Sequence, residues 1–112
     1  MEMNNINEYI DQEDALSRIG GNAALYKKLL GRFADGDAYD ELERIVQSGN
    51  IEEAAQHAHT LKGVSANLSL VKVRSLTTEL EQLLKDNADC SSCLAELKQA
   101  YYITVDLINE LR

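Results

Sequence analysis

Hydrophobic residues recur every three to four positions along most of the chain, a spacing that is typical of amphipathic helices. Clusters of glycine, asparagine and aspartate interrupt the pattern at residues 20–22, 35–37, 48–50 and 86–89. The segments between these clusters predict helices over residues 11–19, 22–33, 51–68, 73–83 and from 93 onward. Gly31 and Gly36 weaken the second helix, which we expect to resume or to continue with a kink through residues 42–46.

Two asparagines mark helix starts. Asn22 and Asn50 are good N-cap residues, and Glu53 follows Asn50 at the spacing of a capping box. Short connections between long amphipathic helices favour antiparallel neighbours. We therefore expect an all-α fold over residues 1–112, a single helical domain built as an antiparallel up-and-down four-helix bundle with a short extra N-terminal helix.

Charge and composition argue against two classes of partner, nucleic acids and membranes. The chain has no proline and a formal net charge of −8 at pH 7. Nucleic-acid phosphates are bound by clustered Lys and Arg, so this charge argues against a nucleic-acid partner. No apolar run reaches the roughly 20 residues that span a bilayer, and the acidic N-terminal segment lacks the pattern of a secretion signal. We therefore expect a cytoplasmic monomer with no membrane partner.

Two histidines lie two positions apart in the segment "HAHTLKG". Each helical residue turns by about 100°, so His57 and His59 point about 200° apart and cannot share one metal ion. We expect no metal site. His57 lies beside the predicted inner face, together with Val64 and Leu68, and we expect it to be half-buried or at the surface with a local hydrogen bond.

His59 shares its helix face with Ala55, Lys62, Gly63 and Ala66, most of which have little or no side chain. A glycine inside a helix costs roughly 1 kcal/mol relative to alanine, and close approach of another molecule would explain it. A neutral imidazole is a competent nucleophile, and a lysine one turn away suits a phosphate. The spacing alone leaves open an ordinary exposed histidine beside a lysine, with a glycine that serves internal packing.

The segment "AHTLKGVSANLSL" resembles the signature of histidine-containing phosphotransfer (Hpt) domains. The segments "RIGGNAALYKKLLGRF", "SGNIEEAAQHAHTLKG" and "LTTELEQLL" resemble the family's first core helix, its approach to the histidine and its following helix, so the resemblance covers roughly residues 14–108. It implies a four-helix bundle with an exposed phosphoryl-accepting histidine. By this resemblance His59 is the phosphorylation site, Lys62 supports the phosphate or the partner's acidic pocket, and Gly63 keeps the docking surface open.

The resemblance also implies supporting positions. Ala66 and Asn67 stand in the later part of the motif. Glu81 matches a glutamate that, in some kinase-linked members, hydrogen-bonds the ring Nδ1 and leaves Nε2 as the nucleophile; a solvated carboxylate is the alternative. The chain departs from the motif at Ser69, where the family has a glycine, and this change could move the helix boundary or the partner preference.

The chain has no phosphate-binding loop of the GxxxxGK[ST] kind, so we expect phosphate to come from a partner rather than from ATP. The resemblance implies response-regulator receiver domains and a sensor histidine kinase as partners. It also implies that Mg²⁺ is held by the receiver, and that the chain has no cofactor of its own. A non-catalytic helical module that docks a receiver or a kinase without carrying phosphate is the alternative function.

Cys90 and Cys93 form a CxxC pair. Such a pair is credible as a redox motif beside strands, but no segment here has a strand pattern. A structural zinc site needs four ligands, which two thiols and two divergent histidines do not supply. We expect two free thiols, with a CxxC-dependent redox sensor as a third functional alternative.

Overall fold

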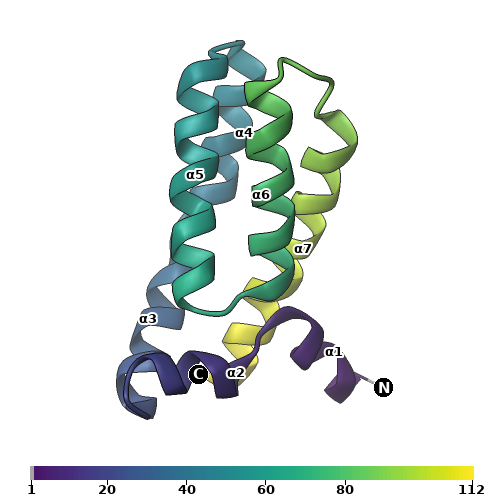
Figure 1. Ribbon diagram of the computed structural model, residues 1–112. Helices are drawn as coiled ribbons and strands as arrows, with labels where there is room; N and C mark the ends of the chain where they lie inside the picture. Colours follow the sequence, from purple (N-terminus) through teal and green to yellow (C-terminus); the bar gives the residue numbers. More distant parts are fainter. Residues whose placement is uncertain (1) are drawn as a thin grey trace.

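The computed structural model describes residues 2–112. Its helices, drawn in Figure 1, are α1 Glu2–Tyr9, α2 Gln12–Arg18, α3 Ala23–Asp35, α4 Ala38–Ser48, α5 Ile51–Asn67, α6 Val71–Lys85 and α7 Ser91–Leu111. Within this part of the chain the only β-type pairing is an isolated bridge between Ile10 and Leu70. The prediction of an all-α fold is confirmed.

In the bundle, α5, α6 and α7 lie beside a broken helical rod (Figure 1). It consists of α3 and α4, separated at Gly36 and Asp37, close to the predicted kink. Next to it, α5, α6 and α7 follow in alternating directions, with the most extensive interface between α5 and α6. The predicted up-and-down arrangement is therefore confirmed.

Side-chain caps fix where the helices begin. Asn22 Oδ1 accepts a hydrogen bond from the Leu25 amide at 3.0 Å, and Asn50 Oδ1 accepts one from the Glu53 amide at 3.1 Å. Asn50 Nδ2 also donates to Glu53 Oε1 at 3.2 Å. The two predicted N-caps are confirmed, and the second one determines where α5, the helix with both histidines, starts.

The N-terminal region differs from the prediction, because it contains two helices instead of one. The first, α1, spans only eight residues, most of them polar, and it packs against α6 and α7. Between the helices, Ile10 is fully buried, and Asp11 caps α2 through a hydrogen bond from the Asp14 amide at 3.1 Å. Because a helix this short is marginal on its own, tertiary packing stabilises α1.

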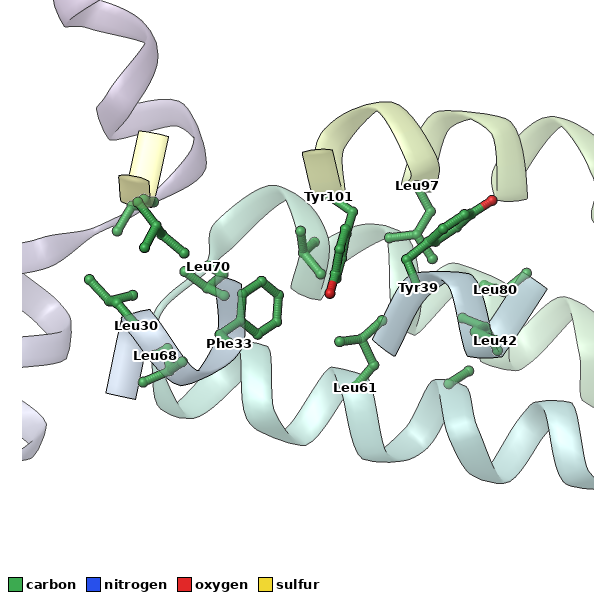
Figure 2. Close-up of a cluster of buried hydrophobic side chains, with 14 of the residues drawn as sticks. Leu30, Phe33, Tyr39, Leu42, Leu61, Leu68, Leu70, Leu80, Leu97 and Tyr101 are labelled. Atoms are coloured by element: carbon green, nitrogen blue, oxygen red, sulfur yellow. The ribbon is translucent and has the colours of Figure 1, made fainter. Parts of the chain in front are cut away.

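The core holds the bundle together around an aromatic cluster. Figure 2 shows Tyr39, Leu97 and Tyr101 gathered with Leu61 of α5. The ring centroids of Phe33 and Tyr101 lie 5.2 Å apart, and those of Tyr39 and Tyr101 lie 5.9 Å apart. Leu61 is buried in this cluster, which fixes the rotation of α5 and directs its opposite face to solvent.

Ser69 joins α5 to α6 in the left-handed backbone region, with φ of 56°. Its carbonyl accepts a hydrogen bond from the Asp11 amide at 2.9 Å, and its hydroxyl donates to Asp14 Oδ2 at 2.7 Å. A residue with a Cβ costs about 1–2 kcal/mol in this conformation. The structure therefore gives a physical reason for glycine at this motif position, and it shows a hydrogen bond that offsets the cost of serine.

This balance predicts a difference between two substitutions. Ser69→Gly relieves the backbone strain while it loses the hydrogen bond, so we expect its unfolding free energy to stay within about 1 kcal/mol of the wild type. Ser69→Ala loses the hydrogen bond and keeps the strain, so we expect about 1–2 kcal/mol of destabilisation. Urea unfolding of the three proteins measures both. Equal stability of the glycine and alanine variants would contradict the strain at this position.

Candidate functional site

The rotation of α5 exposes one histidine and half-buries the other. Ala54, Ala58, Leu61 and Ser65 form the buried face of this helix. On the opposite side, the His59 side chain is 68% exposed. His57 is half-buried beside the groove between α5 and the broken helix. Among the side chains that the structure describes, its ring has no hydrogen bond, contrary to the local hydrogen bond that we expected.

Glu81 of α6 lies next to the exposed histidine. Its Oε2 is 3.1 Å from His59 Nδ1, while its side chain is only 6% exposed. A carboxylate at Nδ1 favours the tautomer that carries its proton there, because the carboxylate can only accept. Among the described residues no hydrogen bond reaches His59 Nε2, so the geometry leaves the outer nitrogen with a lone pair directed away from the carboxylate.

Two lysines compensate the charge of this buried carboxylate. Lys62 Nζ lies 2.8 Å from Glu81 Oε1, and Lys85 Nζ lies 3.1 Å from Glu81 Oε2. The ion pair with Lys62 is the largest cause that lowers the pKa of Glu81 to about 2, and Lys85 contributes in the same direction against the effect of burial. Glu81 is therefore ionised at neutral pH.

This low pKa predicts an acid-dependent loss of stability. The pKa of Glu81 is about 2 in the folded protein and has an ordinary value of 4.5, so its contribution to stability is complete above pH 4.5 and is lost as the pH falls towards 2. Over this pH range the unfolded wild-type chain binds up to one more proton at Glu81 than the folded protein does. Glu81→Gln should remove this difference in proton uptake. Urea unfolding at several pH values measures that difference. If the unfolding free energies of the two proteins fell equally as the pH was lowered from 4.5 to 2, the result would contradict an ion-paired Glu81.

The surface beside His59 is open. His59, Glu81 and Lys85 line a hollow of about 840 Å³ between α5 and α6. One turn along α5, a Cβ added to Gly63 would meet no atom of the described residues within 4 Å. Internal packing therefore does not require glycine at this position, and the alternative of a packing glycine fails for this chain.

The other site positions lie at increasing distance along α5. Ala66 is half-buried on the same face, whereas Asn67 is exposed at the last residue of the helix. Asn67 lines a second hollow, an apolar groove of about 560 Å³ between α5 and the broken helix, with Phe33 and Val64. The structure thus brings His59, Lys62, Glu81 and Gly63 together and directs Asn67 towards the groove.

Lys85 was not recognised from the sequence. It follows Glu81 by four positions on α6, a spacing at which a glutamate and a lysine pair on a helix surface. That signal is readable only once Glu81 is taken as a site residue, because helix surfaces commonly carry such pairs.

The CxxC pair gains no support as a reactive centre. Both cysteines are free thiols. The thiol of Cys93 is buried and donates to the Leu76 carbonyl at 3.5 Å, and burial raises its pKa to about 11. A thiol with such a pKa is protonated at neutral pH and is a poor nucleophile. Among the side chains that the structure describes, no three His, Cys, Asp or Glu residues converge as metal ligands.

None of the helices that the structure describes combines the length and the hydropathy of a membrane-spanning segment. A family model described as the Hpt domain matches residues 34–106, more than half of the chain, and the matched segment includes His59, Lys62 and Glu81. Neither the curated proteins nor the solved structures gave a match. Hpt domains act in phosphotransfer within two-component phosphorelays and interact with receiver domains and kinases in general. On the family match, which agrees with the helical bundle, this chain belongs to the Hpt domain family.

Proposed function

We propose that this chain carries a phosphoryl group on His59, either between receiver-domain aspartates or from a kinase to a receiver. One observation carries the proposal. The exposed imidazole has its Nδ1 3.1 Å from the buried Glu81 carboxylate, which has two lysine partners. An arrangement that fixes one ring nitrogen and leaves the other open is what a nitrogen nucleophile requires.

The transfer step follows from this geometry. The Nε2 lone pair attacks the phosphorus of the partner's aspartyl phosphate, the new N–P bond forms, and the P–O bond breaks with its electron pair on the partner's carboxylate. The Nδ1 proton stays on the ring, and the Glu81 carboxylate stabilises the positive charge that develops there. The reverse sequence returns the group to an aspartate. We expect the Mg²⁺ for this reaction to be held by the receiver domain.

Neighbouring residues have distinct roles in this proposal. Lys62, three positions after His59, supplies positive charge for the phosphoryl oxygens. Gly63 and Ala66 leave room for the partner's active site to approach the ring, because a side chain at Gly63 would project into open space. Asn67, at the end of α5, contacts the partner through the groove that it lines.

Transfer from a phosphorylated receiver tests the proposal. The purified chain is mixed with such a receiver and Mg²⁺, and we expect phosphate on the chain that is labile in acid and stable in base, as is typical of an N–P bond. Phosphate stable in acid would indicate a hydroxyl acceptor and would contradict the proposal.

A docking module without phosphate remains the second candidate. The observation in its favour is the apolar groove beside the site, where Val64 is 40% exposed and Phe33 and Leu29 line the wall. This candidate predicts binding of a receiver with no phosphate on the chain after reaction with several phosphorylated receivers. Binding by calorimetry together with the labelling assay separates the two functions.

A further inference from the structure

The two lysines at Glu81 occupy different oxygens of the carboxylate. Lys62 is 2.8 Å from Oε1, whereas Lys85 is 3.1 Å from Oε2, the oxygen that also faces His59 Nδ1. Lys62 belongs to the same helix as His59, and Lys85 belongs to the same helix as Glu81. The two cations therefore reach the Glu81 carboxylate from different helices.

The separate positions of the two lysines matter because, in the proposed function, Lys62 pairs with two anions in turn, the Glu81 carboxylate and the phosphoryl group. In the free chain Lys62 pairs with Glu81, but after phosphorylation it should serve the phosphoryl group on His59. A carboxylate that is only 6% exposed would be left as an uncompensated buried charge if its sole cation moved away, and this is strongly unfavourable. A site with Lys62 alone would hold that lysine on Glu81.

We propose that Lys85 is a positioning residue, the resident counter-ion of Glu81, which frees Lys62 to exchange Glu81 Oε1 for the incoming phosphoryl oxygens. Lys85 is suited to this role because it pairs with the oxygen at Nδ1, whereas the phosphoryl group is added at Nε2 on the other side of the ring. Its own helix holds it one turn from Glu81, so the pair persists when Lys62 leaves. This inference rests on the proposed function of His59.

The test uses the full chain and two phosphoryl donors. The first is phosphoramidate, from which Nε2 takes the phosphoryl group as the P–N bond breaks and ammonia leaves with a proton; no partner protein takes part. The second is a phosphorylated receiver with Mg²⁺. We expect Lys85→Met to slow labelling by about tenfold with both donors, an effect typical of groups coupled in one ion-pair network. Lys85→Arg keeps the charge and should keep the wild-type rate.

A double-mutant cycle with Glu81→Gln shows whether Lys85 acts through Glu81. The neutral amide needs no counter-ion, so adding Lys85→Met to Glu81→Gln should cause no further loss. The ¹⁵N signal of the Lys62 side chain gives a readout that a purely structural role would not move. It should shift on phosphorylation in the wild type and stay unchanged in Lys85→Met.

The outcomes are distinguishable. Wild-type rates for Lys85→Met with both donors would overturn the inference while the proposed function stands. A loss confined to the receiver would overturn it too, since Lys85 would then be a partner contact. If Lys85→Met slowed labelling as much in the Glu81→Gln variant as in the wild type, Lys85 would not act through Glu81, and the inference would be overturned. A wild-type chain that accepts phosphate from neither donor would instead overturn the proposed function itself.

Discussion

His59→Gln should abolish acid-labile phosphate on the chain, whereas His57→Gln should keep it. His59 is 68% exposed with Nδ1 at the Glu81 carboxylate, and the glutamine amide nitrogen has no lone pair available for attack on phosphorus. His57 lines the groove on the other flank of α5, and among the described residues no carboxylate makes a hydrogen bond or an ion pair with its ring. The measurement is transfer from a phosphorylated receiver with Mg²⁺, followed on the three proteins.

The expected loss is at least about a thousandfold, the scale on which removal of a nucleophile affects an enzyme. Both variants should keep wild-type thermal unfolding, because the His59 side chain is exposed and His57 packs only at the edge of a groove. Receiver binding should survive in His59→Gln, which separates loss of the acceptor from loss of docking. Label that disappears only in His57→Gln would reverse the assignment of the two faces of α5.

The bundle could be predicted because its helices carry strong apolar periodicity between clear breaks. The N-caps at Asn22 and Asn50 are local signals, and both hydrogen bonds are present. The first helix, α1, was not predicted, because eight mostly polar residues are too few to form a stable helix alone and α1 is held by contacts with α6 and α7. The burial of Ile10 against the α5–α6 connection is likewise a tertiary property.

The candidate site likewise has some features that helical spacing predicts and others that depend on how the helices pack. Helical spacing alone sets His59 apart from His57 and brings Lys62 and Gly63 to its face, because all four lie on one helix. No periodicity within α5 or α6 sets the register between them, so the nearness of Glu81 to His59 came only from family resemblance. Once that register is known, Lys85 follows from its position one turn after Glu81.

Substitutions at Gly63 should raise the stability of the chain while they impair transfer from a receiver. An added Cβ meets no atom of the described residues within 4 Å, so the helix gains the propensity of alanine without a clash. We expect Gly63→Ala to be more stable by about 0.5–1 kcal/mol in urea unfolding. Gly63→Leu places a larger side chain one turn from His59, where we expect the partner to approach, and it should slow transfer from a receiver by about tenfold or more, equivalent to ~1.4 kcal/mol of lost docking energy.

The small donor separates the two ways in which Gly63→Leu could act. Phosphoramidate needs no protein surface, so its labelling of His59 should stay near the wild-type rate if the leucine blocks only the partner. A parallel loss with phosphoramidate would mean that the leucine disturbs His59 or Lys62 directly. Wild-type transfer from a receiver would show that the partner does not approach over Gly63, and the helix would then carry a destabilising glycine that neither internal packing nor docking explains. Opposite signs for stability and transfer are thus the signature of a glycine kept for a partner rather than for the fold.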